Sequence, residues 1–499
     1  MSEQGAPRGA QNGASEVEED LEALPDPEGG PANPAGTLAV GAGASHVSQR
    51  TGTRREIWRL ALPVMASMTL ASAVGMIDVW MMKGLGATAQ AAVGFGSQAF
   101  MLAQAVLFAL SFACVSLMAR AIGAKQPDEA RRALATSLTV ALGIGVLLFV
   151  LMGAEPRFVL SYMNPEPAVL ELAAPYLQLV MGATVLMSLS LTFESALRAN
   201  RDTFTPMLVT ALVTVAKVGL NALLIFGVAG VVPPLGVAGA GWATLGAQAI
   251  ALLGFAFVLS RAPAESPLAV RPRDFAGMTT MAPALLRVAA PGVVERAILQ
   301  GAMFTYVSAV GTYGTYAAAA YTIGVRLLSF SWIPGNGFSQ AAATIVGQSL
   351  GAGDLKGAVR ATRRAASLSI VVAIAMGVIA ALADRPLAEA FAADPHTVDA
   401  LIPFMMCLAI AQPFMQLHFT LAGAFRGAGD TVTSLIAAVI GNWVFRVPFA
   451  WLVTSVWHAD LIWVWAVLML DHVARAIWLV WSFRRRDWAK RLGGIAANR

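Results

Sequence analysis

The chain has 499 residues, of which 57% are hydrophobic and only 13% are charged. Soluble domains carry roughly 25% charged residues, so this composition argues against a soluble protein and predicts a membrane protein with several spans. The net charge of +5 does not indicate a nucleic-acid partner, because the basic residues lie mainly in short loops between apolar segments. The two cysteines, Cys114 and Cys407, lie in apolar runs, so we predict no disulfide framework and no metal site.

The first 53 residues differ from the rest of the chain. They are rich in Gly, Ala, Pro and Ser, and they contain a short acidic cluster between Glu16 and Glu22. They lack the apolar core that a signal peptide requires. We therefore predict a disordered tail over residues 1–53, which is either dispensable or a regulatory or docking arm.

Twelve apolar segments follow, and each is long enough for a membrane-spanning helix, which needs ~20 residues at 1.5 Å each. Strands of a membrane barrel would be shorter and would alternate in polarity, so we predict an all-α polytopic protein. Six segments lie at about 57–83, 91–121, 131–153, 169–197, 204–229 and 237–260, and six more at about 284–312, 317–349, 358–383, 399–425, 431–456 and 460–483. We divide the chain into a tail (1–53), an N-lobe (54–260), an inter-lobe linker (261–283), a C-lobe (284–484) and a C-terminal tail (485–499).

Lysine and arginine are concentrated in one of the two sets of loops. That set includes the linker, both ends of the chain and the loops after spans two, four, eight and ten. The opposite set holds only Lys83, Arg157 and Arg385. Because positively charged loops stay in the cytoplasm, we expect both termini and the linker on the cytoplasmic side of the inner membrane.

The two sets of six spans are copies of one another. Equivalent residues lie 228 positions apart, as 291 − 63 = 228 shows for Pro63 and Pro291. The same offset relates Gly123 to Gly351, Pro175 to Pro403, Arg198 to Arg426 and Asp202 to Asp430. Six spans per copy start both copies on the same side, which indicates a parallel repeat with a pseudo-two-fold axis along the membrane normal. We expect the transport path between the lobes, near the midplane.

The first span carries one carboxylate, Asp78, inside its apolar run. Ser67, Ala71 and Gly75 recur every four residues and lead to Asp78 on the same helix face, and small residues of this kind let other helices approach closely. A carboxylate at this depth costs ~2.5–3.5 kcal/mol on insertion scales. Asp78 is therefore expected to face the protein interior and to have a function.

The fifth span has a polar face. Four residues follow one another on it at helical spacing, namely Thr210, Thr214, Lys217 and Asn221. A helix with such a face must line a cavity or a polar bundle interior. Counted at 1.5 Å per residue, Asp78, Lys217, Asn221 and Thr244 of the sixth span lie at similar heights in the outer half of the membrane.

The C-lobe has charges of its own. Glu295 in the seventh span and Arg326 in the eighth both fall near the midplane, so we expect that they can form an ion pair. Arg446 in the eleventh span and Asp471 in the twelfth are deep enough to pair in the same way. Each pair is open to two interpretations, a structural ion pair or a coupling or substrate-binding site.

Other polar residues have simpler interpretations. Glu194 lies four residues before Arg198, which predicts a local surface ion pair near the cytoplasmic end of its helix. His418 is expected to be a hydrogen-bonded structural histidine. The candidates for the lining of the cleft between the lobes are Gln98, Met76, Tyr306 and Gln300. Flexible Met-rich walls suit promiscuous binding, although Met and aromatic residues at helix interfaces are equally consistent with packing.

Several motifs of this chain are similar to those of the multidrug and toxic compound extrusion (MATE) family of secondary transporters. They are LALP with MIDVWMMKGLG in the first span, LRANRDTFTPM and FRGAGDTVTS after spans four and ten, NALLIFG with GVAGAGWAT in spans five and six, AAPGVVE at the start of span seven, IGVRLLSFSWIPGNGFSQAAATIVGQSLGAG in span eight and NWVFRVP in span eleven. The resemblance covers about residues 55–485. It implies two six-helix lobes that alternate between inward- and outward-open states. It also implies export of organic cations or other amphipathic compounds against an inward flow of protons or sodium.

The resemblance also suggests an ion site in the N-lobe. The family pairs the first-span Asp with an Asn and an Asp in span five and a Thr in span six. Asp78 and Thr244 match, but Lys217 stands where the Asn is usual and Asn221 where the Asp is usual. The lost oxygen ligands and the added positive charge argue against sodium and favour protons as the coupling ion. The Asp78–Lys217 pair is then either a switch that protonation or substrate opens, or a permanent structural salt bridge. In the family an acidic residue at the Glu295 position has been linked to cation coupling or substrate binding.

The sequence raises three possible functions. The first is an antiporter for small molecules that acts as a monomer in the bilayer without a cofactor. The second is a flippase or exporter for a lipid or lipid-linked precursor, which would favour a cationic cleft; Lys217, Arg326 and Arg446 keep it open. The third is an intramembrane enzyme, which we do not expect, because the sequence lacks hydrolase and metalloprotease motifs. A Walker motif for ATP-driven pumping is also absent from the sequence.

Overall fold

The computed structural model of the chain describes residues 52–228, 231–392 and 394–485. Contacts divide the chain into two units, Met1–Val47 and Ser48–Arg499, and every described residue belongs to the second. Nearly all of the expected N- and C-terminal tails therefore lies outside the described residues. The described part is built from helices. It contains no strand, and its β-structure is limited to one isolated bridge between Val228 and Val232. The predicted all-α class is confirmed.

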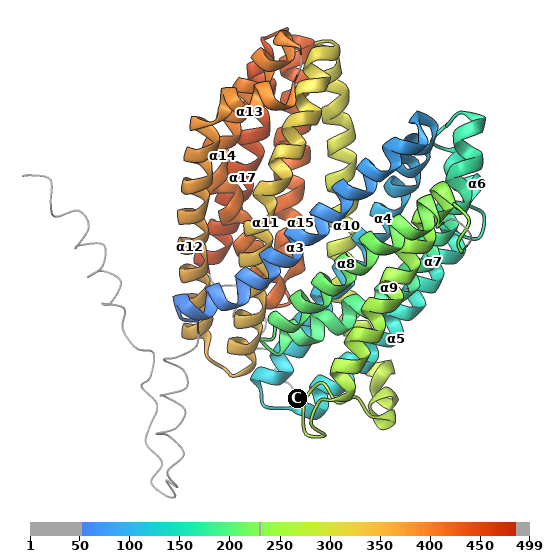
Figure 1. Cartoon of the computed structure of the whole chain (residues 1–499). Coiled ribbons are helices and arrows are strands. Elements are labelled where there is room, and N and C mark those ends of the chain that lie inside the picture. Colours follow the sequence, from blue (N-terminus) through green and yellow to red (C-terminus); the bar gives the residue numbers. More distant parts are fainter. Residues whose placement is uncertain (1–51, 229–230, 393, 486–499) are drawn as a thin grey trace, which may run out of the picture. The chain divides into compact units, whose positions relative to one another are not determined.

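Six long helices make up the first half of the described chain (Figure 1). They are α3 (Arg54–Met82), α4 (Ala87–Gly123), α5 (Pro127–Met152), α7 (Pro167–Ala199), α8 (Phe204–Phe226) and α9 (Gly236–Ser260). The short helices η1 (Lys83–Leu85) and α6 (Pro156–Ser161) lie in connections between them. Within this half, α7 packs against α4, α5 and α9, and α8 packs against α3 and α9.

The second half repeats this order. Its long helices are α10 (Met278–Gly311), α11 (Thr315–Gly351), α12 (Leu355–Leu382), α14 (Pro395–Gly427) and α17 (Leu461–Arg485). The equivalent of α8 is a run of α- and π-helical turns, namely α15 (Thr431–Val439), η3 (Ile440–Arg446), α16 (Val447–Trp451) and η4 (Leu452–Val456). The short α13 (Asp384–Phe391) precedes α14, and η2 (Pro272–Gly277) precedes α10.

Repeated sequence signals start equivalent helices. Asp202 accepts a hydrogen bond from the backbone N–H of Thr205 at the start of α8, and Asp430 accepts one from Thr433 at the start of α15. In both places a carboxylate satisfies a backbone donor that the first helical turn leaves free, from the N-cap position in α15 and from one residue before it in α8. The donors are 228 positions apart (433 − 205), so the repeat in the sequence is also a repeat of local structure.

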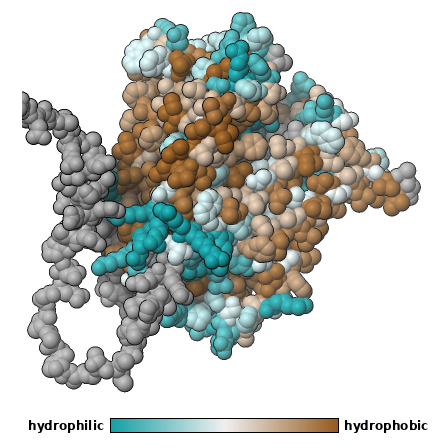
Figure 2. Space-filling view, turned by 60° about the vertical axis from the view of Figure 1, so that its left-hand side comes forward, coloured by the Kyte–Doolittle hydropathy of each residue, from teal (hydrophilic) through white to brown (hydrophobic). Residues whose placement is uncertain are grey.

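Among the described residues, ten helical segments are long and apolar enough to cross a membrane. The continuous run Thr431–Val456 counts as one of them. Helices α10 and α11, with 34 and 37 residues, are also long enough to cross a membrane. They do not, however, combine high hydropathy with low charge as the ten segments do. The expected count of twelve spans depends on these two helices. Figure 2 shows apolar side chains over most of one face, with hydrophilic ones gathered in separate patches, as a surface in contact with lipid requires.

Each half has its own apolar core. In the second half, an aromatic cluster joins α10, α11, α14 and α17, and the Tyr321 ring stacks on Trp465 at a centroid distance of 6.3 Å. Phe404 meets Trp465 edge-on at 5.1 Å. In the first half, Met81, Leu177 and Ile225 belong to the corresponding cluster. Other clusters join the halves, since Ile57 of α3 packs with Phe338 of α11, and Leu110 of α4 packs with Leu285 of α10.

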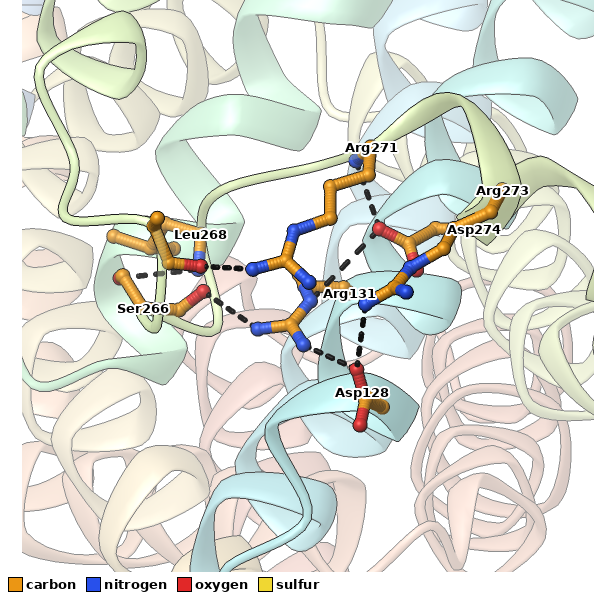
Figure 3. A network of polar contacts seen from close by, with 8 residues as sticks. Asp128, Arg131, Ser266, Leu268, Arg271, Arg273 and Asp274 are labelled. Atoms are coloured by element: carbon orange, nitrogen blue, oxygen red, sulfur yellow. Dashed lines mark hydrogen bonds and ion pairs between the residues drawn. The ribbon is translucent and has the colours of Figure 1, made fainter.

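The linker between the halves is fixed to the first half. Figure 3 shows Arg131 of α5 between two linker groups: its guanidinium donates to the Ser266 carbonyl oxygen at 3.2 Å and approaches the Asp274 carboxylate at 3.9 Å. Asp274 is buried, and it also accepts a hydrogen bond from the Arg271 backbone N–H at 2.8 Å. Arg131 also pairs with Asp128 one turn earlier. The linker is thus an ordered segment that is bound to the N-lobe.

Candidate functional site

Asp78, Lys217 and Asn221 form a compact polar group between α3 and α8. The Lys217 ammonium donates to Asp78 Oδ2 at 2.5 Å, and the Asn221 side-chain amide donates to Asp78 Oδ1 at 2.5 Å. The predicted contact of Asp78 with Lys217 is confirmed. The side chains of Asp78 and Lys217 are 25% and 18% exposed, so protein does not fully enclose the ion pair, although it lies well inside two apolar helices.

The sequence positions these groups through helix geometry. Lys217 and Asn221 are four residues apart, so they lie one turn apart on the face of α8 that packs against α3. Asn221 is buried, and its carbonyl oxygen Oδ1 has no hydrogen-bond partner among the described residues. Thr244 of α9 is buried too, but its hydroxyl donates to the Ala240 carbonyl within its own helix. The structure thus brings together three of the four predicted N-lobe residues and leaves Thr244 outside the group.

The expected pair of Glu295 with Arg326 is wrong. Glu295 of α10 accepts a hydrogen bond from the Arg426 guanidinium at 2.7 Å, and both side chains are largely buried. Arg426 lies near the end of α14, and it also covers the Phe112 ring of α4 at 4.9 Å. Counting residues did not bring Arg426 to the height of Glu295, because α14 has 33 residues and is longer than a bilayer is thick. Arg326 is exposed on α11.

A small cavity lies beside the Glu295–Arg426 pair. Its volume of about 20 Å³ is enough for one water molecule. Residues of both halves line it, namely Ala109, Phe112, Val288, Gly292, Glu295, Arg296, Arg426 and Thr431. Arg296 was missing from the predicted site residues, although it directly follows Glu295 in the sequence.

Asp471 is the centre of a second buried group in the C-lobe. It pairs with Arg446, as predicted, and also with Arg475 one turn later, whose Nε donates to Asp471 Oδ1 at 2.5 Å. A Cβ atom on Gly441 would lie 2.1 Å from Asp471 Oδ1, so only glycine lets the carboxylate approach η3 so closely. Gly441 and Arg446 belong to this π-helical segment, and π-turns inside α-helices are frequent at functional sites.

His418 and His472 make a contact that the sequence did not predict. His418 Nε2 of α14 lies 3.0 Å from His472 Nδ1 of α17, and the rings stack at 5.2 Å between centroids. His418 is therefore hydrogen-bonded, as predicted for a structural histidine. No spacing rule along one helix could have found His472 as its partner. The predicted local pair of Glu194 with Arg198 forms, but its expected place on the surface is wrong, because both side chains are largely buried.

The predicted cleft-lining residues differ in exposure. Gln98 and Met76 are exposed, and Gln300 is partly buried. Tyr306 is wrong as a lining residue, because its side chain is 0% exposed and its hydroxyl donates to the Val464 carbonyl at 2.7 Å. Tyr306 belongs to the C-lobe core, where its ring packs near Tyr321.

The two halves touch where α4 and α11 end, on the side of the spans that carries the Lys- and Arg-rich loops. We call this side the basic end. A Cβ atom on Gly123 would lie 2.0 Å from the Gln348 carbonyl oxygen, and one on Gly351 would lie 2.0 Å from the Arg120 carbonyl oxygen. These contacts are related by the repeat, since 351 − 123 = 348 − 120 = 228. Glycine is required in both positions for backbones to approach this closely.

Hydrogen bonds across the halves follow the same symmetry. The Ser116 hydroxyl donates to the Gly427 carbonyl at 3.2 Å, and the Gln348 amide donates to the Ala199 carbonyl at 2.7 Å. The accepting carbonyls are again 228 positions apart (427 − 199). The halves are therefore closed against each other at the basic end.

Comparison with known proteins identifies the family. A family model described as MatE matches residues 63–223 and 291–452. The chain belongs to the MatE family. The two MatE matches begin 228 residues apart (291 − 63), which is the offset of the repeat.

Full-length relatives support this assignment. The chain is 27% identical to a probable multidrug resistance protein NorM of Thermotoga maritima, over 88% of this chain and 94% of that protein. It is 28% identical to a probable NorM of Rhizobium meliloti, over 85% of this chain and 92% of the relative.

Solved structures share the MatE fold. The model superimposes on a MOP superfamily transporter from Pyrococcus furiosus with a TM-score of 0.81 at 22% identity, covering 90% of this chain and 99% of the other. It superimposes on a MATE protein in complex with MaL6 with a TM-score of 0.82 at 22% identity, covering 90% and 100%. This MatE chain is thus a multi-pass membrane transporter.

Proposed function

We propose that this chain is a proton-coupled antiporter that exports small amphipathic or cationic compounds across the cytoplasmic membrane by alternating access. The family assignment and the NorM relatives, described as probable multidrug resistance proteins, support export. The concentration of Lys and Arg at the basic end supports a cytoplasmic location for that end and for both termini. With the halves in contact there, the described conformation would be closed toward the cytoplasm.

The Asp78–Lys217–Asn221 group is the observation that carries the choice of coupling ion. Both carboxylate oxygens of Asp78 accept hydrogen bonds from nitrogen donors. Hard cations such as sodium need a set of oxygen ligands, and here an ammonium group occupies the place beside the carboxylate. A proton needs no such set, because it binds the carboxylate itself.

Protonation would change the balance of charge at this group. A proton on Asp78 removes the negative charge that holds Lys217 and leaves a cation in a partly buried position, which is unfavourable without a partner. Lys217 would then move toward water or toward a substrate group, and α8 would shift relative to α3. Loss of the proton on the other side of the membrane would restore the pair. The pair couples proton flow to transport only if it opens in this way.

Transport in reconstituted liposomes tests the proposal. Efflux of a fluorescent organic cation is driven once by a pH step and once by a sodium step of the same size. We expect the pH step alone to drive efflux and D78N to abolish it. Efflux driven by sodium at constant pH would overturn proton coupling.

The flippase is a second candidate, and the arginines of the C-lobe favour it, since a cationic cleft suits a phosphorylated headgroup. The same liposomes decide between the two functions. Movement of a labelled lipid between leaflets, together with an absence of gradient-dependent dye efflux, would replace the antiporter with the flippase.

A further inference from the structure

The carboxylates in the middle of the spans, namely Asp78, Glu295 and Asp471, are all paired with cations among the described residues, whereas two arginines in the middle of C-lobe spans are not paired with carboxylates. Asp78 binds Lys217, Glu295 binds Arg426, and Asp471 is shared by two arginines. Arg296 of α10 and Arg326 of α11 are both exposed, and neither side chain forms an ion pair or a hydrogen bond with another described residue. The membrane-embedded part of the C-lobe therefore carries an excess of positive charge.

Arg326 lies on the face of α11 that is turned toward the other lobe. It precedes Gly351 by 25 residues, and at 3.6 residues per turn this spacing returns to within about 20° of the same helix face. Gly351 is in backbone contact with α4 of the N-lobe. Arg326 thus lies on the same inter-lobe face of α11 as Gly351, but farther from the basic end, where the lobes are in contact.

The repeat gives an independent check of this placement. The equivalent of Arg326 is Gln98 (326 − 228 = 98), which precedes Gly123 by the same 25 residues on α4 and is also exposed. An exposed guanidinium facing lipid at this depth would be very unfavourable. Both lines of argument place Arg326 at a water-filled space between the lobes.

Arg296 lies on the same space, closer to the basic end. It lines the small cavity together with Arg426 and with Phe112 of α4. Phe112 precedes Gly123 by 11 residues, which again places it within about 20° of the inter-lobe face of α4. The nearest carboxylate on the cavity, Glu295, is already bound to Arg426. Arg296 therefore lies against residues of the N-lobe and forms no ion pair of its own among the described residues.

We propose that Arg326 and Arg296 bind the anionic group of a transported amphipathic compound, such as a carboxylate or a sulfonate on an apolar body. Guanidinium groups form two parallel hydrogen bonds with such oxyanions, and two of them at different depths provide successive positions along the path. The cavity beside Arg296 has room for a polar group rather than for a whole compound. This inference rests on the proposed export function and applies to those of its amphipathic substrates that carry an anionic group.

Binding of a matched pair of probes to the purified full-length protein in a non-ionic detergent tests the inference. The probes are 1-pyrenesulfonate and 1-pyrenemethylammonium, which share one aromatic body and differ in charge. We expect the sulfonate to bind more tightly. R326Q, which introduces the residue of the equivalent N-lobe position, and R296Q are each expected to weaken sulfonate binding about tenfold. The affinity of the ammonium probe should stay unchanged or rise.

R385Q is the matched control, because Arg385 lies in the short helix α13, is exposed and, among the described residues, forms an ion pair with Glu389 alone. It should leave the affinity for both probes unchanged. Because Arg326 has no side-chain partner to lose, R326Q is expected to fold even if R296Q does not. Tighter binding of the ammonium probe, or unchanged sulfonate binding in R326Q, would overturn the inference.

Phosphatidylglycerol added to the micelles distinguishes a soluble anion from a lipid headgroup. Sulfonate binding that persists in excess phosphatidylglycerol supports the substrate site, whereas binding of the lipid alone, lost in R326Q, would assign the arginines to a headgroup and overturn it. These measurements use no gradient, so they can fail or succeed independently of proton-driven efflux.

Discussion

At the scale of single residues, the membrane-embedded charges of this chain divide into three groups. The Asp78–Lys217 pair is partly exposed, the Asp471 group and the Glu295–Arg426 pair are buried, and Arg296 and Arg326 form no ion pair among the described residues. Solvent access separates the first group from the second. A buried pair can only be structural unless a large movement opens it, whereas an accessible carboxylate can exchange protons directly.

A double-mutant cycle on Asp78 and Lys217 separates structure from coupling. D78A leaves Lys217 without a counter-charge, and we expect it to lower the unfolding free energy by about 1–3 kcal/mol, discounted from a fully buried pair because both groups are partly exposed. D78A/K217A should recover most of this stability, since no lone charge remains, but should not transport with a pH gradient. Thermal unfolding in detergent and pH-driven efflux measure the two effects.

K217A is the decisive single variant of that cycle. Efflux at the wild-type rate, with wild-type protein yield, would show that the pair has no role in coupling. T244A is a control, because the Thr244 hydroxyl contacts only its own helix, and it is expected to keep both stability and coupling.

Contacts of single residues could be predicted where the partners lie on one helix or at one height in neighbouring spans. Glu194 with Arg198 and Asp78 with Lys217 were predicted for these reasons. Glu295 with Arg426 was not, because long helices that extend beyond the bilayer make the residue count a poor measure of height. His472 was not predicted as a partner of His418, since a contact between two helices leaves no periodic signal within either helix.

At the scale of elements, the π-helical segment η3 is the largest departure from the repeat. Its equivalent in the N-lobe is part of the regular helix α8, yet η3 carries Gly441 directly against the Asp471–Arg475 pair. The sequence could predict the length of this span but not its helix type, because no residue in IGNWVFR dictates a π-turn. The wide turn is set by tertiary contacts with α17.

G441A tests whether the polar group of Asp471 holds this segment in place. The added methyl group would lie 2.1 Å from the carboxylate and 2.5 Å from Arg475 Nε, so either the ion pair or the helix must shift. We expect a loss of unfolding free energy of about 1–3 kcal/mol, as for other overpacked interiors, measured by thermal unfolding in detergent. G143A on α5, where no atom lies within 4 Å, is expected to leave stability unchanged or slightly raise it, and equal effects of the two variants would contradict this account.

The linker is the second element whose structure the sequence did not show. Its Pro and Arg residues predicted a polar connection, whereas the contacts of Asp274 and Arg131 fix it to α5 (Figure 3). D274A removes the acceptor of the Arg271 backbone N–H in a buried position, which should cost about 1–3 kcal/mol locally.

Limited trypsin digestion measures this local loss, since trypsin can cleave the linker after Arg261 and Arg273, whereas the Arg271–Pro272 bond resists it. We expect faster cleavage of the linker in D274A than in the wild type. D128A is the comparison, because the Asp128 side chain is largely exposed, and it should change the rate little. Equal rates of trypsin cleavage in D274A and the wild type would mean that Asp274 does not fix the linker to the N-lobe.

At the scale of the whole molecule, the repeat does more than duplicate a fold. Ala119 and Gly347 are equivalent residues (347 − 119 = 228), and a Cβ atom on Gly347 would lie 2.8 Å from that of Ala119. Equivalent residues touch each other only on the symmetry axis, so the pseudo-two-fold axis passes through this contact. Alternating access by a rocking of two equivalent lobes would separate α4 from α11 at this point.

A disulfide across the axis tests whether this contact must open. In a background that carries C114A and C407A, the pair A119C/G347C places two thiols close enough to bond after a small outward shift, since Cβ atoms in disulfides lie ~3.8 Å apart. We expect oxidation to stop gradient-driven efflux and reduction to restore it. Each single-cysteine variant controls for the substitutions and should transport equally with and without oxidant. Full transport by the cross-linked protein, with cross-linking verified by electrophoretic mobility after cleavage in the linker, would show that the basic end stays closed during the cycle and that the lobes do not rock about this axis.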